Sequence, residues 1–186
     1  MQDLTQIKAE ARKAAFQRRK VAHDMNKPGT AGHLSEVLAG YRGVPLAGYM
    51  PIRTEIDPLP AMAEAAAHGL VGVPVIQAAE TPLKFSRWTP EGALRDGPFG
   101  AKVPEIDDYF EPEILIVPLV GFDARGGRLG YGGGFYDRTL ELLRGKRPTL
   151  AIGFAYEAQR ADALPLEPTD QPLDMIVTEN GIYDIR

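Results

Sequence analysis

The sequence feature that most constrains the fold is a run of glycines between an apolar segment and an amphipathic one. Six of the nine residues from Gly126 to Gly134 are glycine. The apolar run Ile114–Val117 is typical of a buried strand, and Phe135–Arg144 has the spacing of an amphipathic helix. Glycine permits positive φ and close approach to a ligand, and a helix start offers unpaired N–H groups. Together they predict an anion cradle, most often one for phosphate.

A plain flexible connection is the alternative interpretation of these glycines. Arg128 and the aromatic pair Phe135 and Tyr136 disfavour it, because flexible linkers consist mainly of Gly and Ser. The segment lacks the Gly-Lys-Ser/Thr ending of a P-loop, and Phe135 stands where the dinucleotide fingerprint has Gly or Ala. The sequence therefore predicts a phosphate loop of a third kind.

Composition limits the chemistry of the chain. Its 186 residues are 44% hydrophobic and 25% charged, which suits one globular domain over residues 1–186. The formal net charge of −4 favours no nucleic-acid partner. Cysteine is absent, which excludes thiol catalysis, and His23, His33 and His68 lack metal-ligand spacing. With no apolar run of roughly 20 residues and no signal-peptide pattern, we expect a cytoplasmic protein without a membrane partner. We also expect a monomer.

Helices and strands are predicted to alternate along the chain. The first helix covers Asp3 to about Val21, with Asp3 or Thr5 as its N-cap. Further helices are predicted over 31–41, 59–68 and 135–144, and strands over 44–50, 70–76, 82–88, 114–117, 149–154 and 175–178. The stretch 89–112 is predicted to be a long lid or binding loop, and Trp88 a packing residue. This order predicts a single three-layer α/β/α domain with a mostly parallel central sheet.

The glycine segment also resembles a known signature. Arg128–Asp137 (Arg-Leu-Gly-Tyr-Gly-Gly-Gly-Phe-Tyr-Asp), preceded by Pro118–Asp123, resembles the signature of the 5-formyltetrahydrofolate cyclo-ligase (methenyltetrahydrofolate synthetase) family. The likeness covers nearly the whole chain. It implies a fold related to sugar-phosphate isomerases and CoA transferases. It also implies ATP-dependent cyclisation of 5-formyltetrahydrofolate to 5,10-methenyltetrahydrofolate through a phosphorylated formyl intermediate, with reduced folate and ATP as small-molecule partners.

Two cations of the first helix gain a role from this resemblance. Lys8 and Arg12 lie four residues apart and share a helical face. From spacing alone, a solvated basic face is the plainer interpretation. The family's Lys-x-x-x-Arg falls on these positions, which implies nucleotide contacts from both. Lys13 and Arg18–Lys20 match no part of the motif and are expected to be solvated.

The resemblance implies a nucleotide site made of these cations and the glycine segment. Lys8, Arg12 and Arg128 are the predicted catalytic residues, because cations neutralise a transferring phosphoryl group. The predicted ATP-binding residues are these three together with Leu129, Gly130, Tyr131, Gly132, Gly133, Gly134, Phe135 and Tyr136. Animal members carry basic residues at the positions of Tyr131 and Gly133, so backbone N–H donation is the contact expected to persist here.

The resemblance also implies the folate and metal sites. Glu55, an ordinary loop carboxylate from its context alone, matches a family glutamate that contacts the folate; a carboxylate can accept paired N–H bonds from a pterin. Met50 is predicted to line the same pocket. Asp137 and Asp170 are the implied Mg²⁺ ligands, with Asp174 as the fallback for the second. Asp137 is also a favourable charge in the first turn of a helix.

Two functions of other classes remain open. One is a non-catalytic folate or nucleotide binder, which the intact cations and metal-binding carboxylates disfavour. The other is a sugar-phosphate isomerase or a CoA transferase on a similar sheet, either of which would work without ATP.

Overall fold

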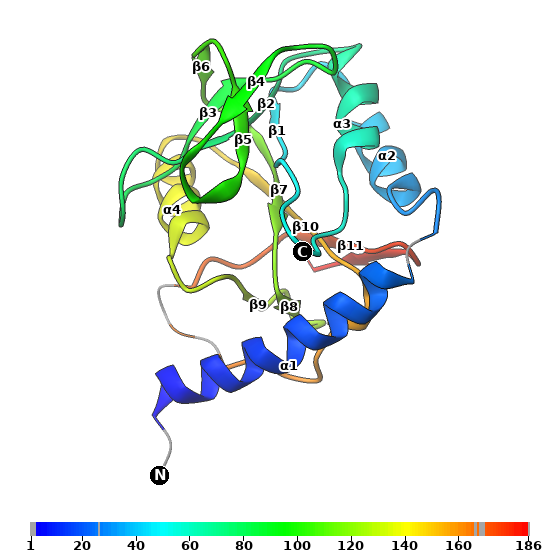
Figure 1. Cartoon of the computed structure of the whole chain (residues 1–186), viewed down its shortest axis with the longest axis vertical. Helices are drawn as coiled ribbons and strands as arrows, with labels where there is room; N and C mark the ends of the chain where they lie inside the picture. The colour runs from blue at the N-terminus through cyan, green and yellow to red at the C-terminus, as the bar shows by residue number, and fades with distance from the viewer. Residues whose placement is uncertain (1–2, 26, 166, 168–169, 186) are drawn as a thin grey trace.

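The computed structural model describes residues 3–25, 27–165, 167 and 170–185. An eight-stranded sheet forms its centre (Figure 1). From one edge to the other the strands are β12 (Ile182–Asp184), β11 (Met175–Val177), β10 (Leu150–Phe154), β7 (Ile114–Pro118), β1 (Leu46–Ala47), β2 (Val71–Val75), β3 (Lys84–Arg87) and β6 (Tyr109–Phe110). The five strands from β11 to β2 are parallel, and the strands outside them are antiparallel. The predicted, mostly parallel sheet is confirmed.

Helices cover both faces of the sheet. Along β7, Ile114 and Ile116 pack in the core under α2 (Gly32–Ala39) and α3 (Leu59–Ala66), while Leu115 and Val117 pack in the core under α4 (Phe135–Lys146). Side chains alternate between the two faces of a strand, so a strand buried on both faces is apolar throughout. The three-layer arrangement agrees with the prediction.

Helix α1 (Leu4–Asp24) lies beyond the carboxyl ends of the central strands (Figure 1). Asp3 caps it as predicted, because its Oδ1 accepts the Gln6 N–H at 2.8 Å. The helix packs against η2 (Glu157–Gln159) and β8 (Gly121–Phe122). The carboxyl edge of a parallel sheet is where ligands bind in open α/β folds. Helix α1 therefore places its side chains over the edge where a site is expected.

Two predictions about local structure are wrong in part. The strand predicted over 44–50 pairs only at Leu46–Ala47, because Pro45 has no N–H to donate and the chain leaves the sheet after Gly48. The stretch 89–112 is not a plain loop: β4 (Leu94–Asp96) and β5 (Lys102–Pro104) form a hairpin through η1 (Pro98–Gly100), and β6 joins the main sheet. Its prolines and glycines shape the hairpin turn, where the Gly97 N–H donates to Ala101 O.

Trp88 is buried in the core, as the packing interpretation predicted. Among the helices that the structure describes, none combines the length and the apolar character needed to cross a bilayer.

Candidate active site

The six glycines divide into two structures with different tasks. Gly126, with φ +87°, belongs to the turn between β8 and β9 (Arg128–Leu129). The fully buried carboxylate of Asp123 holds this turn by accepting the N–H groups of Arg125 and Gly127 at 2.9 and 3.1 Å. The remaining four glycines lie in Gly130–Gly134, which we call the glycine cradle and which lines a cavity. The sequence alone did not separate the turn from the cradle.

The glycine cradle needs left-handed backbone at two positions. Gly132 has φ +98°, and Gly134, the N-cap of α4, has φ +71°. A side chain at either position would strain the backbone. The helix start therefore opens directly onto the cavity, with Asp137 in its first turn. Unpaired N–H groups and the positive end of the helix dipole favour an anion there.

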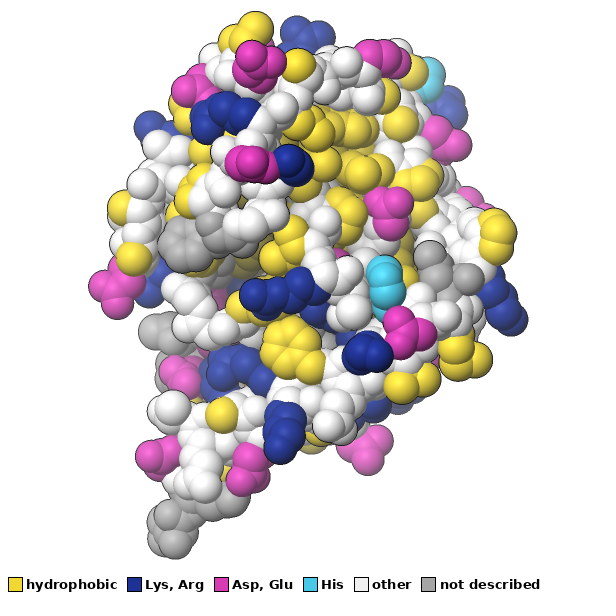
Figure 2. Space-filling model, in the orientation of Figure 1, with side chains coloured by type: hydrophobic (Ala, Val, Ile, Leu, Met, Phe, Trp, Pro, Cys, Tyr) yellow, Lys and Arg dark blue, Asp and Glu magenta, His cyan; other side chains and the backbone are white. Residues whose placement is uncertain are grey.

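The cavity has a volume of about 450 Å³, within the range of small-molecule sites. It lies between α1, the glycine cradle, the loop after β1 and the β4–β5 hairpin. Figure 2 shows Lys and Arg side chains gathered over α1 and hydrophobic side chains gathered farther up, between the β4–β5 hairpin and α3. The structure brings all the predicted site residues to this cavity: Lys8, Arg12, Met50, Glu55, the run Arg128–Asp137 and Asp170.

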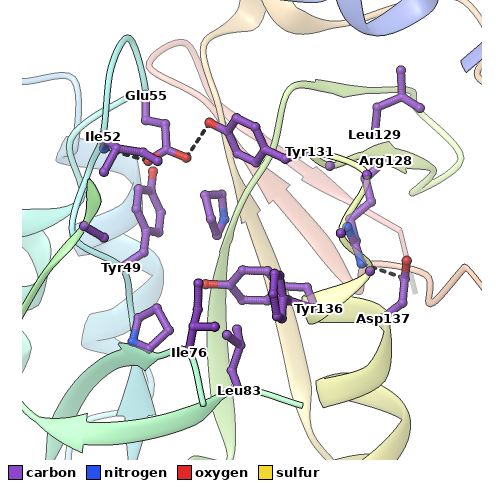
Figure 3. Close-up of a pocket in the computed structure, with 18 of the residues that line it drawn as sticks. Tyr49, Ile52, Glu55, Ile76, Leu83, Arg128, Leu129, Tyr131, Tyr136 and Asp137 are labelled. Carbon is purple, nitrogen blue, oxygen red and sulfur yellow. Dashed lines mark hydrogen bonds and ion pairs between the residues drawn. The ribbon is translucent and has the colours of Figure 1, made fainter. Parts of the chain in front are cut away.

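One end of the cavity is apolar and holds a buried carboxylate. Tyr49, Ile76 and Leu83 form its wall with Tyr136 (Figure 3). Glu55 lies beside them as a residue only 6% exposed, and its Oε1 accepts the Ile52 N–H at 2.8 Å. Burial raises the pKa of Glu55 above its usual value, although this hydrogen bond opposes the shift. A ligand with a flat apolar body and an N–H edge fits this end.

The other end of the cavity is charged. Lys8 Nζ lies 3.1 Å from Asp170 Oδ2 and 3.1 Å from Glu167 Oε1. Arg128 Nη2 lies 2.6 Å from Asp137 Oδ1 (Figure 3). Burial lowers the pKa of the Arg128 guanidinium, and the charge of Asp137 opposes that shift. Each of these cations thus has an acidic partner inside the cavity.

Arg12 ties the first helix to the glycine cradle, since its Nε donates to Gly130 O at 2.8 Å. Its guanidinium also lies close to Gly132, so a side chain added there would meet it at 3.7 Å. Arg12 therefore reaches the cradle, and Lys8 lines the same cavity from the same face of α1.

The prediction that Arg18–Lys20 are all solvated is wrong for Arg19, a residue that is only 1% exposed. Its Nε donates to Thr54 Oγ1 at 2.9 Å, and its Nη1 donates to the Tyr131 hydroxyl at 2.6 Å. The spacing Lys8, Arg12, Ala15, Arg19 marks one helical stripe and could have identified it. Glu167, which pairs with Lys8, was also not predicted, and nothing in its local sequence marks it.

The positions and partners of the carboxylates show which of them could hold a metal ion. Among the described residues there is no cluster of three or more His, Cys, Asp or Glu suited to a metal. Asp137 and Asp170 nevertheless line the same cavity, and Mg²⁺ needs only one or two carboxylates when phosphate and water complete its shell. Asp174 instead accepts from Arg144 and from the Ala151 N–H. The donor set fits a metal carried by a nucleotide.

Comparison with known proteins identifies the family. The sequence profile of the 5-formyltetrahydrofolate cyclo-ligase family matches residues 5–179. The chain belongs to this family. A 5-formyltetrahydrofolate cyclo-ligase of Haemophilus influenzae is 41% identical over 51% of this chain and 54% of its own. One of Mycolicibacterium smegmatis is 29% identical over 96% of this chain and 97% of its own.

The matched region spans about half the length of the Haemophilus relative and 39% of the Escherichia coli relative, which is 44% identical there. Among solved structures, the NMR structure of Aquifex aeolicus 5,10-methenyltetrahydrofolate synthetase matches 97% of this cyclo-ligase family member and 93% of its own chain. That match has a TM-score of 0.79 and 26% identity. The fold of the family is thus present along nearly the whole chain.

Proposed function

We propose that this family member catalyses the ATP-dependent conversion of 5-formyltetrahydrofolate to 5,10-methenyltetrahydrofolate, with release of ADP and phosphate. The observation that carries the proposal is a single cavity with two chemically distinct ends. The glycine cradle with Lys8, Arg12 and Arg128 suits a triphosphate, and the apolar end with Glu55 suits a pterin. A cavity that joins the two ends supports a reaction in which a phosphoryl donor binds beside a folate.

The reaction needs positioning more than it needs a protein nucleophile. The formyl oxygen attacks the γ-phosphorus and ADP leaves, which gives an N5-iminium phosphate. N10 then attacks the iminium carbon and loses its proton, and the C–O bond to phosphate breaks. Phosphoryl transfer of this kind depends on alignment and charge neutralisation. The cations and backbone N–H groups of the cavity supply both.

A buried hydroxyl supports the folate assignment. In the described part of the chain, the Tyr136 hydroxyl is buried and has no hydrogen-bond partner. A buried polar group without a partner costs roughly 1–3 kcal/mol. Tyr136 lies between the Glu55 end and Arg128 (Figure 3), so a polar atom of a bound folate can satisfy it. We infer that Tyr136 contacts the substrate between its pterin and the phosphate being transferred.

The metal and the finer properties belong to the same proposal. Mg²⁺ bound with ATP would neutralise phosphate charge, held by Asp137 and Asp170, which line the charged end. Asp170 lines the cavity and Asp174 does not, which supports Asp170 as the second ligand. We also infer a single monomeric domain, a cytoplasmic location, and a sheet related to those of sugar-phosphate isomerases and CoA transferases.

A direct assay tests this function. We expect near-ultraviolet absorbance of methenyltetrahydrofolate to appear when the protein is mixed with 5-formyltetrahydrofolate, ATP and Mg²⁺. Omitting ATP or chelating the metal should abolish the signal. Folate binding without product would favour the non-catalytic binder, and turnover of a sugar phosphate or a CoA ester without ATP would favour the other class. Either result would refute the proposal.

Lys8→Ala is expected to raise the KM for ATP about 10- to 100-fold, because a charge-assisted hydrogen bond contributes about 1.5–3 kcal/mol. The KM for 5-formyltetrahydrofolate should stay within about twofold of wild type, since Lys8 lies at the charged end of the cavity. Initial rates at varied ATP measure this effect. Lys20→Ala on the same helix is the control, because Lys20 is exposed and pairs only with Asp24 among the described residues. Equal loss of both affinities in Lys8→Ala would contradict the assignment.

A further inference from the structure

A chain of polar side chains runs from the middle of α1 to Glu55. Arg19 Nη1 donates to the Tyr131 hydroxyl at 2.6 Å, and that hydroxyl donates to Glu55 Oε2 at 2.8 Å. Figure 3 shows the Tyr131 hydroxyl directed at the Glu55 carboxylate. Arg19 also donates to Thr54, the residue before Glu55. One buried guanidinium thus supports the folate-site carboxylate by two routes.

The chemistry of the three side chains fixes which group donates and which accepts in each hydrogen bond. A guanidinium has donors and no acceptor, so the Tyr131 oxygen must accept a hydrogen bond from Arg19. The Tyr131 O–H then donates a hydrogen bond to Glu55. Glu55 must then accept at Oε2, and it also accepts the Ile52 N–H at Oε1. Both oxygens are therefore held as acceptors, and each keeps lone pairs for a ligand. A protonated Glu55 would break the pattern.

Packing keeps the donors in place. The Arg19 guanidinium carbon lies 5.0 Å from the centre of the Phe16 ring and 5.5 Å from that of the Tyr131 ring. The Phe16 and Tyr131 rings lie 5.7 Å apart. Cation–π contacts of this kind favour a buried guanidinium. Arg19 is thus confined on its faces by rings and at its edge by two hydroxyls.

Tyr131 also belongs to the glycine cradle, so the hydrogen bonds from Arg19 through Tyr131 to Glu55 connect the folate end of the cavity with the cradle. The backbone of Tyr131 lies between Gly130, which accepts from Arg12, and Gly132, which has a left-handed φ. A phosphate bound by this backbone would fix the Tyr131 ring, and the ring in turn fixes Glu55. The two ends of the cavity are connected through one side chain.

We propose that Arg19 and Tyr131 are positioning residues that hold Glu55 as an acceptor for the folate and link its placement to nucleotide bound in the glycine cradle. The proposal rests on the proposed function. It assigns a side-chain role to Tyr131, where the sequence led us to expect only backbone N–H donation, and a role to Arg19, which lies outside the motif.

The hydrogen bonds from Arg19 through Tyr131 also affect the charge state of Glu55. Burial raises the pKa of Glu55, whereas the Tyr131 hydroxyl and the positive charge of Arg19 lower it. The charged or titratable groups that face Glu55 from the surrounding elements are Arg19, Arg53, Tyr49, Tyr131 and Tyr136. Removing the hydroxyl or the guanidinium should therefore raise the pKa of Glu55 further. Folate affinity should then be lost at a higher pH as the solution is acidified.

Tyr131→Phe tests the link with little risk to folding, because the ring that packs on Phe16 is kept. We expect the KM for 5-formyltetrahydrofolate to rise about tenfold, since a hydrogen bond to a charged group is lost. The acidic limb of kcat/KM for the folate should move to higher pH. The KM for ATP should change less than threefold. Arg19→Gln should act in the same direction, and Lys20→Gln should match wild type in every measurement.

Equilibrium binding tests the coupling. In the wild type, a non-hydrolysable ATP analogue with Mg²⁺ should tighten 5-formyltetrahydrofolate binding at least fivefold, within the usual range of coupling between sites. In Tyr131→Phe the analogue should change folate affinity less than twofold. Wild-type-like folate KM, pH profile and coupling in Tyr131→Phe would overturn the inference. So would an equal loss of folate and ATP affinity, which would make Tyr131 a general support of the loop.

These outcomes separate the link from the reaction itself. If the wild type formed no methenyltetrahydrofolate, the proposed function would fail, while the binding measurements would still decide whether Tyr131 supports Glu55. If the wild type were active and Tyr131→Phe bound folate normally with intact coupling, only the link would fail.

Discussion

Glu55→Gln is expected to lower kcat/KM for 5-formyltetrahydrofolate about 100-fold. Its carboxylate is buried and lies with both oxygens acting as acceptors at the apolar end of the cavity. Glutamine keeps the shape but replaces one acceptor with a donor, which faces either the Tyr131 hydroxyl or the Ile52 N–H. Two hydrogen bonds to a charged group are weakened, which together contribute about 3 kcal/mol or more. Initial rates at varied folate measure the effect.

ATP binding provides the internal comparison for this variant. The dissociation constant of a non-hydrolysable ATP analogue, measured without folate, should stay within about twofold of wild type, because Glu55 lies at the opposite end of the cavity from Lys8. Glu64→Gln is the matched control, since Glu64 is an exposed carboxylate of α3. Normal folate kinetics in Glu55→Gln, or an equal fall in nucleotide affinity, would remove Glu55 from the folate site.

Arg128→Met is expected to lower kcat on the order of 1000-fold. Arg128 is buried at the charged end and reaches Asp137 at 2.6 Å. Its Nε atom is buried and finds no hydrogen-bond partner among the described residues, so a donor is free for a phosphate oxygen. Removing one preorganised donor costs about 100- to 1000-fold, and arginine contacts to a transferring phosphoryl group can contribute more. Methionine keeps the bulk of the side chain and removes only its charge and donors.

Single-turnover rates at saturating ATP and folate measure the chemical step in this variant. Arg128→Lys should fall between wild type and Arg128→Met, because lysine restores the charge but not the planar fork. Arg147→Met serves as the control, since Arg147 ends α4 in a surface pair with Glu111 and should leave kcat within twofold. A kcat for Arg128→Met close to wild type would show that Arg128 does not act on the transferred phosphate.

The sequence predicted the layers and the cradle because both depend on local chemistry. The apolar runs that become β7 and β10, and the glycines before α4, impose their structures with little help from the rest of the chain. Lys8, Arg12 and Glu55 came from the family resemblance, and the structure places all three at one cavity.

Features that depend on distant partners escaped prediction. Arg19 looks like its basic neighbours in the sequence, and its burial depends on Thr54 and Tyr131, which come from elsewhere in the chain. The β4–β5 hairpin escaped for a similar reason, since its short strands are stabilised by pairing rather than by an apolar pattern. Helical spacing identifies the stripe that contains Arg19, but tertiary contacts decide which side chains of a stripe are covered.

The acid–base pairs at the charged end have a consequence for how substrate enters. Lys8 and Arg128 are each neutralised by carboxylates of the same cavity before any ligand arrives. A triphosphate without a bound metal ion would have to displace those carboxylates from the cations. The negative charge of the carboxylates would then lie close to the negative charge of the triphosphate. In the proposed reaction, a nucleotide that carries a divalent cation avoids this repulsion. Its phosphates pair with Lys8 and Arg128, and its divalent cation pairs with the carboxylates that they release. We therefore expect the protein to discriminate against uncomplexed nucleotide at the binding step, before any bond is made.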